Sequence, residues 1–246
     1  MYLEQKYSFL KPIKTNYLQR YGVKFDGGYV IDSKVIGCSN KLVSFGLGTD
    51  WSFELDYLKL VGNKIHLYDY TTTYRPYFKE IFKYLRRFIT FRVPYRDLRV
   101  KIDGYLRLKK FLNNPNVKFF REKITFPINN KNETDLKKVF TRLDHKDSVV
   151  LKCDIEGSEY KIIEQIYNLS HRIDMLIIEF HWINKSNNEK VFVESIKKLK
   201  EKFNIIHLHG NNYSNQSNTG LPDVLEVTLT NLKFTPDVIE YKHKFP

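Results

Sequence analysis

Asp154 and Glu156 stand two residues apart, after a short apolar run and immediately before Gly157. The run, VVLKC over residues 149–153, has the continuous β-branched character of a strand buried on both faces. In open α/β sheets, ligands bind just beyond the carboxyl ends of the parallel strands. The spacing therefore predicts two carboxylates at a binding site, where they can accept a proton, hold a metal ion or bind a polar ligand.

Other ionisable side chains lie at or near the ends of later apolar segments: Glu179, His181, His207, His209 and Glu226. Residues two apart share one side of a strand, so Glu179 can lie beside His181, and His207 beside His209. Oxygen ligands with one imidazole suit Mg²⁺ or Mn²⁺, and Asp154 with Glu179 or His181 is the candidate metal set. The predicted catalytic groups are Asp154, Glu156, His181 and His209, with either histidine as a base near neutral pH. Without a metal, His181 would act alone.

Structural roles remain open for several of these residues. Glu156 can cap the following helix with Lys152 as its ion-pair partner, and His207 can be a hydrogen-bonded core histidine. Trp182 offers either a platform for an apolar sugar face or simple core packing. Asn211 and Asn212 fit a polyhydroxylated ligand, and asparagines are also ordinary loop residues.

A second candidate site begins at SFGLGTD, residues 44–50, between a predicted strand and a predicted helix. Gly46 and Gly48 allow the backbone to approach a ligand closely, although Asp50 stands where a dinucleotide-binding fingerprint has its third glycine. Asp69 ends the next predicted strand, where an acid can accept hydrogen bonds from ribose hydroxyls. Together these residues indicate a nucleoside-binding half-site; the alternative is a plain turn with a surface acid.

These residues need a framework, and the chain alternates apolar strand patterns with helical ones. Strands are predicted at 41–45, 64–68, 117–124, 149–153, 175–180, 204–209 and 224–230, and helices at 52–61, 76–90, 133–143, 160–168 and 188–203. This alternation predicts an α/β fold with a mostly parallel seven-stranded sheet and helices on both faces. The last strand follows a polar loop, which favours antiparallel pairing with the strand before it.

The net charge of +13 is concentrated in one segment. Between Tyr74 and Lys110, twelve Lys and Arg residues oppose three acidic ones, a net charge of +9. Apolar residues at 78, 82, 85 and 89 predict an amphipathic helix within a basic insertion at about 74–112. It is either a solvated basic helix over an ordinary core, or a surface for a phosphorylated or acidic ligand or an anionic membrane.

Cys38 and Cys153 lack metal-site spacing and are interpreted as buried thiols without a chemical role. The sequence contains no apolar run of about 18 residues, and its N-terminus lacks the apolar centre of a secretory signal. We therefore expect a soluble, cytoplasmic protein.

Six segments resemble S-adenosylmethionine-dependent methyltransferases of the FkbM type: DGGYV at 26–30, SFGLGTDWSFELD at 44–56, HLYDYT at 66–71, LKCDIEGSEY at 151–160, LIIEFHW at 176–182, and HLHGNNY followed by LPDVLEVTL. The resemblance spans nearly the whole chain, and LKCDIEGSEY is its most specific part. It implies a class I (Rossmann-like) methyltransferase domain over residues 41–246, with residues 1–40 as an extension over the cofactor pocket.

The resemblance also implies a cofactor site made of Asp26, Gly27, Gly28, Tyr29, Gly46, Gly48, Asp50 and Asp69. The Asp-Gly-Gly segment has an alternative role as a plain tight turn. The implied reaction is O-methylation of a sugar hydroxyl in a glycan or a phosphate- or lipid-linked precursor. The alternatives are RNA ribose O-methylation, with Lys152, Asp154 and Glu226 in a lysine–carboxylate tetrad, and a non-catalytic basic binding module on the same scaffold.

Overall fold

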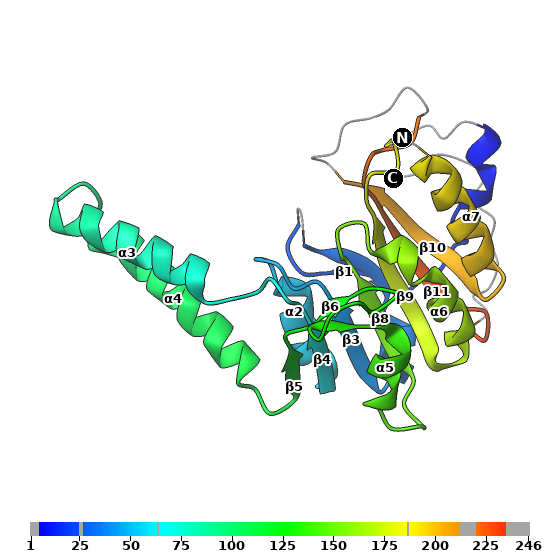
Figure 1. Cartoon of the computed structure of the whole chain (residues 1–246), viewed down its shortest axis with the longest axis horizontal. Coiled ribbons are helices and arrows are strands. Elements are labelled where there is room, and N and C mark those ends of the chain that lie inside the picture. Colours follow the sequence, from blue (N-terminus) through cyan, green and yellow to red (C-terminus); the bar gives the residue numbers. More distant parts are fainter. Residues whose placement is uncertain (1–4, 25–26, 63, 186, 212–219, 235–246) are drawn as a thin grey trace.

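A computed structural model describes residues 5–24, 27–62, 64–185, 187–211 and 220–234. Its centre is a seven-stranded sheet in the order β10-β11-β9-β8-β3-β4-β5 (Figure 1). The strands are β3 (Lys41–Phe45), β4 (Lys64–Tyr68), β5 (Val117–Phe120), β8 (Val149–Cys153), β9 (Ile173–Phe180), β10 (Phe203–Gly210) and β11 (Leu225–Asn231).

The strand order identifies the fold class. From β5 through β4, β3 and β8 to β9 the strands are parallel, and β11 runs antiparallel between β9 and β10. This is the class I (Rossmann-like) methyltransferase fold, as predicted, and the antiparallel last strand is also confirmed. The strand order reverses between β3 and β8, where open α/β sheets bind their ligands.

Helices cover both faces of the sheet because successive strand residues point to opposite sides. One core contains Phe45 and Leu151 and is covered by α5 (Leu136–Thr141), α6 (Ile163–Asn168) and α7 (Asn188–Lys200). The other contains Leu42 and Val150 and is covered by α1 (Ser33–Cys38) and α2 (Ser52–Val61). Strands β8 and β9 contribute to both cores, which explains why their sequences are apolar except at Lys152, Asp174 and Glu179.

Several predicted elements differ from the structure. The strand expected at 117–124 ends at Phe120, and β6 (Lys123–Ile124) pairs instead with β7 (Glu133–Thr134) in a separate two-stranded sheet. Residues 133 and 134 are therefore not helical, and α5 begins after Asp135, whose side chain accepts a hydrogen bond from the Lys138 amide. The helix expected at 160–168 is a 3₁₀ turn, η2 (Glu159–Lys161), followed by α6. Cys153 is buried as predicted, whereas Cys38 is exposed.

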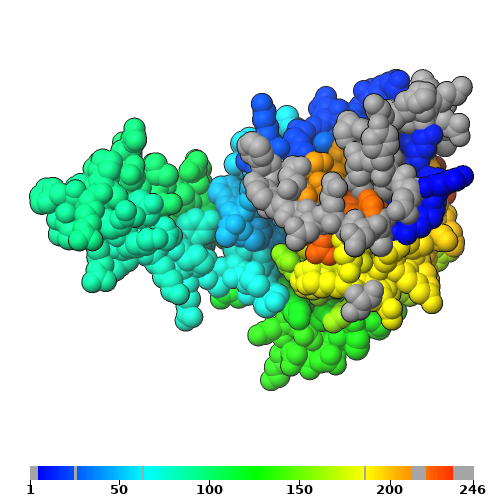
Figure 2. All heavy atoms as spheres, turned by 90° about the horizontal axis from the view of Figure 1, so that it is seen from above, coloured from blue at the N-terminus to red at the C-terminus, as the bar shows by residue number. Residues whose placement is uncertain are grey.

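The basic insertion forms a helical hairpin of α3 (Arg75–Ile89) and α4 (Tyr95–Leu112), which extends away from the sheet (Figures 1 and 2). The two helices pack through aromatic contacts, including Phe78 with Tyr105 and Phe88 with Tyr95. No residue of α3 is buried. The apolar face of α3 therefore does not cover an ordinary core. Within the part of the chain that the structure describes, no helix has the length and apolarity to cross a membrane.

The N-terminal segment adds η1 (Gln5–Leu10) and a hairpin of β1 (Leu18–Tyr21) and β2 (Tyr29–Asp32). This hairpin is tied to the sheet through Val30, whose carbonyl accepts a hydrogen bond from the Thr228 hydroxyl at 2.7 Å. At its turn, the Gly22 amide donates to Asp56 and the Val23 amide to Ser52, both on α2. The hairpin thus contacts β11 through Val30 and α2 through its turn.

Candidate functional site

A cavity of about 250 Å³ opens at the carboxyl ends of β3, β4 and β8, beside the point where the strand order reverses. Its wall combines residues of the predicted nucleoside-binding half-site with residues of the predicted site around Asp154. They are Gly46, Gly48, Tyr68, Asp69, Tyr70, Thr71, Glu122, Lys123, Ile124, Asp154, Ile155, Glu156 and Ser158. The structure therefore brings Gly46, Gly48 and Asp69 to one cavity with Asp154 and Glu156, as the positions at strand ends predict.

Asp69 holds the loops around this cavity in place. One carboxylate oxygen accepts hydrogen bonds from the amides of Leu47 and Gly48 and from the Thr72 hydroxyl, each at 2.9 Å. The other accepts from the amide and hydroxyl of Thr71 and from the Thr72 amide. Burial opposes ionisation, but the hydrogen bonds from Gly48, Thr71 and Thr72 outweigh it and lower the pKa of Asp69. Asp69 is thus an ionised organiser of two loops, a role that its sequence position alone did not indicate.

The two glycines of the loop after β3 have different structural roles. Gly46 has a φ of 78°, and a Cβ built there would lie 1.7 Å from the carbonyl oxygen of Asp154. Gly48 has a φ of 57° with open space where a Cβ would stand. Gly46 thus permits close contact between the backbones of the two half-sites, and Gly48 supplies a turn that faces the cavity. Asp50 does not line this cavity; its carboxylate accepts from the Ser52 amide at the start of α2.

Of the predicted DGGY segment, Asp26 lies outside the described residues, and Gly27, Gly28 and Tyr29 do not line the cavity. Gly27 packs against the Asp50 carboxylate, and the Gly28 carbonyl accepts a hydrogen bond from Arg20 at 2.6 Å. Tyr29 reaches the site from another direction, because its hydroxyl donates to Asp154 Oδ2 at 3.1 Å. The part of the segment that the structure describes therefore brings a tyrosine hydroxyl to the predicted catalytic carboxylate.

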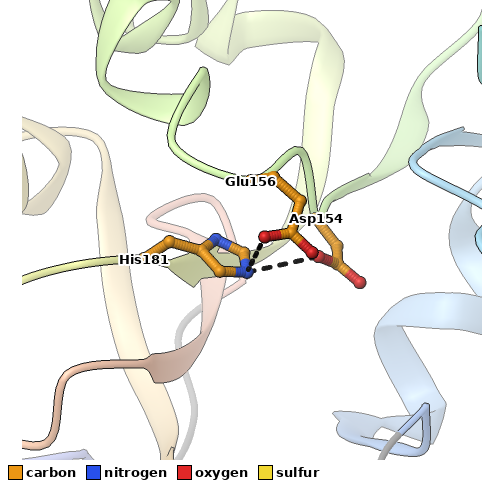
Figure 3. Close-up of side chains that lie close together, drawn as sticks. All are labelled: Asp154, Glu156 and His181. Carbon is orange, nitrogen blue, oxygen red and sulfur yellow. Dashed lines mark ion pairs between the residues drawn. The ribbon is translucent and has the colours of Figure 1, made fainter. Parts of the chain in front are cut away.

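Asp154, Glu156 and His181 converge at the edge of the cavity (Figure 3). His181 Nε2 lies 3.7 Å from Asp154 Oδ1 and 3.8 Å from Glu156 Oε2. One ligand atom from each residue lies within 4.8 Å of the others, a spacing that a divalent cation can bridge. Glu156 thus takes the place predicted for Glu179 in the candidate metal set.

His181 is oriented by Glu159, a fully buried carboxylate. Glu159 Oε1 accepts from the His181 amide at 2.8 Å and lies 3.2 Å from the ring Nδ1, while Oε2 accepts from the Gly157 amide at 2.8 Å. Burial alone would lower the pKa of His181, but the hydrogen bond and charge of Glu159, together with the charges of Glu179 and Asp154, raise it to about 9. In the metal-free protein His181 is therefore a cation at neutral pH. It does not fit the predicted role of a base acting there without a metal.

This raised pKa predicts a pH-dependent stability. The contribution of His181 to the free energy of unfolding is complete below its unfolded pKa of about 6.5 and is lost as the pH rises through about 9. We expect metal-free wild-type protein to lose on the order of 3 kcal/mol over this range relative to His181→Gln. Urea unfolding at pH 6 and pH 9.5 measures the difference. His145→Gln, in an exposed turn, is the matched control, and a wild-type pH dependence retained in His181→Gln would contradict the assignment.

A buried ion pair lies behind Asp154. Lys152 Nζ is 3.2 Å from Glu54 Oε1 and 3.9 Å from Asp154 Oδ2, and donates to the Gly46 carbonyl at 2.9 Å. Glu54 also accepts from the Ser44 hydroxyl at 2.6 Å, while its Oε2 has no hydrogen-bond partner among the described residues. The partner of Lys152 is thus Glu54 from α2, and not Glu156, which the sequence left open as an alternative. Burial would lower the pKa of Lys152, but the charges of Glu54 and Asp154 raise it.

The remaining candidates form a row across neighbouring strands. Glu179 of β9 lies opposite Glu226 of β11, and Glu226 lies opposite His209 of β10. Burial, with Arg20 nearby, lowers the pKa of His209, so its imidazole is neutral at physiological pH. Asn211 donates to Glu179 Oε1 at 3.2 Å. These groups therefore line one edge beside the Asp154 cluster.

His207, another residue considered at this edge, does not extend the site. Burial and the neighbouring His209 and Arg20 lower the pKa of His207 to about 4, which fits a neutral, structural histidine. Asn212 lies outside the described residues.

Two residues of this site have left-handed backbone conformations without being glycine. Glu156 has a φ of 52° and Trp182 a φ of 56°. The indole of Trp182 packs on Gly157, where a Cβ would lie 2.4 Å from the ring. Such strained residues cluster at functional sites, where surrounding structure holds them. Gly157 is therefore required to seat Trp182 beside His181.

Sequence reasoning did not assign roles to Glu54 and Glu159. Glu159 is the last acid of the LKCDIEGSEY segment and lies one residue before the helix predicted at 160–168. That position could have indicated a local structural role. Glu54 carries a weaker signal, a charged residue on the apolar face of a predicted helix, next to Phe53. An acid at such a position indicates a buried partner.

No protein-family model and no curated protein sequence matches the chain. Similar solved structures include fibrillarin in complex with Nop5p, which is 12% identical with a TM-score of 0.44 over 89% of this chain and 93% of that one. An rRNA methylase from Streptococcus thermophilus is 11% identical with a TM-score of 0.40, over 81% and 93%. A precorrin-6y C5,15-methyltransferase from Geobacter metallireducens is 13% identical with a TM-score of 0.39, over 80% and 84%. At this level of similarity, the strand order remains the basis of the fold assignment.

Proposed function

We propose that this protein is an S-adenosylmethionine-dependent O-methyltransferase of the FkbM type that acts on a sugar hydroxyl of a glycan or glycan precursor. The observation that carries the proposal is a single cavity bounded by the Gly46–Gly48 loop and Asp69 on one side and by Asp154 and Glu156 on the other. A cofactor held by the loop would present its methyl group toward these carboxylates. Methyl transfer from a sulfonium is an in-line displacement that depends chiefly on alignment.

The second requirement is removal of the acceptor proton. Asp154 is the proposed base, because its carboxylate lies in the cavity and is held by the Tyr29 hydroxyl and the Lys152 ammonium. The neutral His209, further along the same edge, is a second candidate for accepting a proton.

The donor set of Asp154, Glu156 and His181 also fits Mg²⁺ or Mn²⁺. A bound cation would supply Lewis acidity that lowers the pKa of the acceptor hydroxyl. Glu159 beside Nδ1 supports this assignment, since ligating histidines usually donate their other ring N–H to a carboxylate or carbonyl.

The sugar acceptor is favoured by the polar groups beside the cluster. Trp182 presents a partly exposed indole next to His181, and Asn211, just after β10, donates a hydrogen bond to Glu179 of β9. An aromatic face next to amide and carboxylate groups suits a polyhydroxylated ring. RNA ribose methylation through a Lys152 tetrad is less well supported, because Lys152 is buried against Glu54 with a raised pKa and is a poor base.

Calorimetric titration with S-adenosylhomocysteine tests the cofactor site, run with Mn²⁺ and again with chelator. Tyr70, whose ring lines the cavity and is 52% exposed, supplies the sharpest variant. We expect Tyr70→Ala to weaken binding about tenfold through lost contact with the flat cofactor base.

Tyr17→Ala is the matched control, because Tyr17 is 49% exposed and does not line the cavity. It should bind as the wild type does. No binding to the wild-type protein in either condition would remove the methyltransferase proposal, and equal losses in both variants would move the site elsewhere.

A further inference from the structure

The hairpin of α3 and α4 exposes an apolar row that the sheet domain does not cover, although Phe78 at its start also contacts Tyr105 of α4. Spacings of three and four residues place four side chains on one face of α3: Phe78, Phe82, Leu85 and Ile89. All four are exposed, and Phe82 and Ile89 are each 65% exposed. Single exposed apolar residues are ordinary, but a continuous row of large ones indicates an interaction surface.

The tip of the hairpin carries a second, independent signal. Phe91 is 97% exposed and has a left-handed φ of 55°, which is unfavourable for a bulky residue. Neither packing nor backbone preference explains an aromatic ring in this place. The ring extends the apolar row of α3 beyond the end of the helix.

Basic side chains flank the row. Phe78 and Phe82 line a groove of about 620 Å³ together with Lys79, Lys83, Arg86 and Arg87. The whole segment from Tyr74 to Lys110 has a net charge of +9. An apolar strip bordered by Lys and Arg is the pattern of helices that lie in the interface of an anionic membrane.

We propose that the α3–α4 hairpin docks on an anionic membrane surface, with the apolar row and Phe91 inserted among the headgroups and the flanking Lys and Arg at the level of the lipid phosphates. A second copy of the chain fits less well, because its hairpin would bring an equal positive charge against this one. RNA fits less well because Leu85 and Ile89 cannot stack on bases as aromatic rings do.

The base of the hairpin is fixed to the sheet domain, so the whole protein is held at the membrane when the helices dock. Leu108 and Phe111 of α4 are buried in the sheet core, and the Phe111 ring stacks on Trp51 with centroids 4.9 Å apart. The 18 residues of α4 span about 27 Å. The hairpin therefore extends well beyond the sheet domain (Figure 2).

Vesicle sedimentation with the full-length protein tests the proposal at low and at physiological salt. We expect phosphatidylcholine vesicles that contain phosphatidylglycerol to bind at least about tenfold more tightly than pure phosphatidylcholine. Phe82→Gln with Phe91→Asn should weaken this binding about tenfold or more by removing the inserted rings, and Lys79→Glu with Arg86→Glu should do the same by reversing charge.

Matched controls lie on the sheet domain. Leu60→Gln, at a residue 66% exposed on α2, controls for lost apolar surface, and Lys131→Glu with Lys137→Glu controls for lost charge. Both should bind vesicles as the wild type does. The proposal is overturned if anionic vesicles do not bind, or if control and hairpin variants lose binding equally. It is also overturned if the hairpin variants abolish dimerisation in sedimentation velocity, or single-stranded RNA binding, while vesicle binding is unchanged. Cofactor titration of the same variants should match the wild type, which separates this surface from the proposed methyltransferase site.

Discussion

Asp154→Asn is expected to lower methyl transfer by about 10³-fold, while the affinity for S-adenosylhomocysteine stays within about threefold of wild type. The amide keeps the shape of the side chain and can still accept from the Tyr29 hydroxyl. It cannot take up the acceptor proton, and it no longer provides a negative charge beside His181. Turnover is measured as transfer of labelled methyl from S-adenosylmethionine to the acceptor found in a screen of sugars and nucleotide sugars.

Two comparisons make this experiment specific. Asp103→Asn, on the exposed hairpin, should leave both turnover and cofactor affinity unchanged. Glu156→Gln should weaken Mn²⁺ binding. Its loss of methyl transfer should be smaller than that of Asp154→Asn, because the Glu156 side chain is mostly exposed at the edge of the cluster. Normal turnover in Asp154→Asn would show that another group removes the proton.

Lys152→Met is expected to destabilise the protein by about 3–5 kcal/mol, the largest stability effect that we predict. Glu54 is fully buried, and the substitution leaves its charge with the Ser44 hydroxyl as its one remaining polar contact given by the structure. The loss of the bond to the Gly46 carbonyl also loosens the loop that borders the cavity. Urea unfolding at neutral pH measures the change.

The double variant Lys152→Met with Glu54→Gln separates a broken ion pair from simple loss of packing. Removing both charges eliminates the unpaired buried carboxylate, so most of the lost stability should return. If the double variant is as unstable as Lys152→Met alone, the pair does not account for the effect. Lys41→Met serves as a comparison in which a smaller loss of stability is expected, since the ion pair of Lys41 with Asp147 lies nearer the surface.

The sheet was predictable because its main strands have recognisable local sequence patterns. Segments such as residues 149–153 are buried at every position between two helical layers, and all but Lys152 are apolar. The positions of Asp69 and Asp154 at strand ends were predictable for the same reason. The two-stranded sheet of β6 and β7 was not, because each strand has only two residues and shows no periodicity.

The partners of the site residues could not be predicted in the same way. Lys152 meets Glu54 from α2, almost a hundred positions earlier in the chain, and no local pattern encodes that contact. The amphipathic spacing of α3 indicated a helix with an apolar face, but periodicity does not say whether anything covers that face. In the structure, the hairpin extends beyond the core, and the face remains exposed.

The six hydrogen bonds that Asp69 accepts have a kinetic consequence. Because Asp69 already holds these loops in one conformation, little conformational change remains when a ligand arrives. Binding should therefore follow the encounter without a separate slow step. Stopped-flow binding should then follow a single phase whose rate rises linearly with ligand concentration. Product would leave at a rate set by its own contacts, because no loop has to unfold to release it.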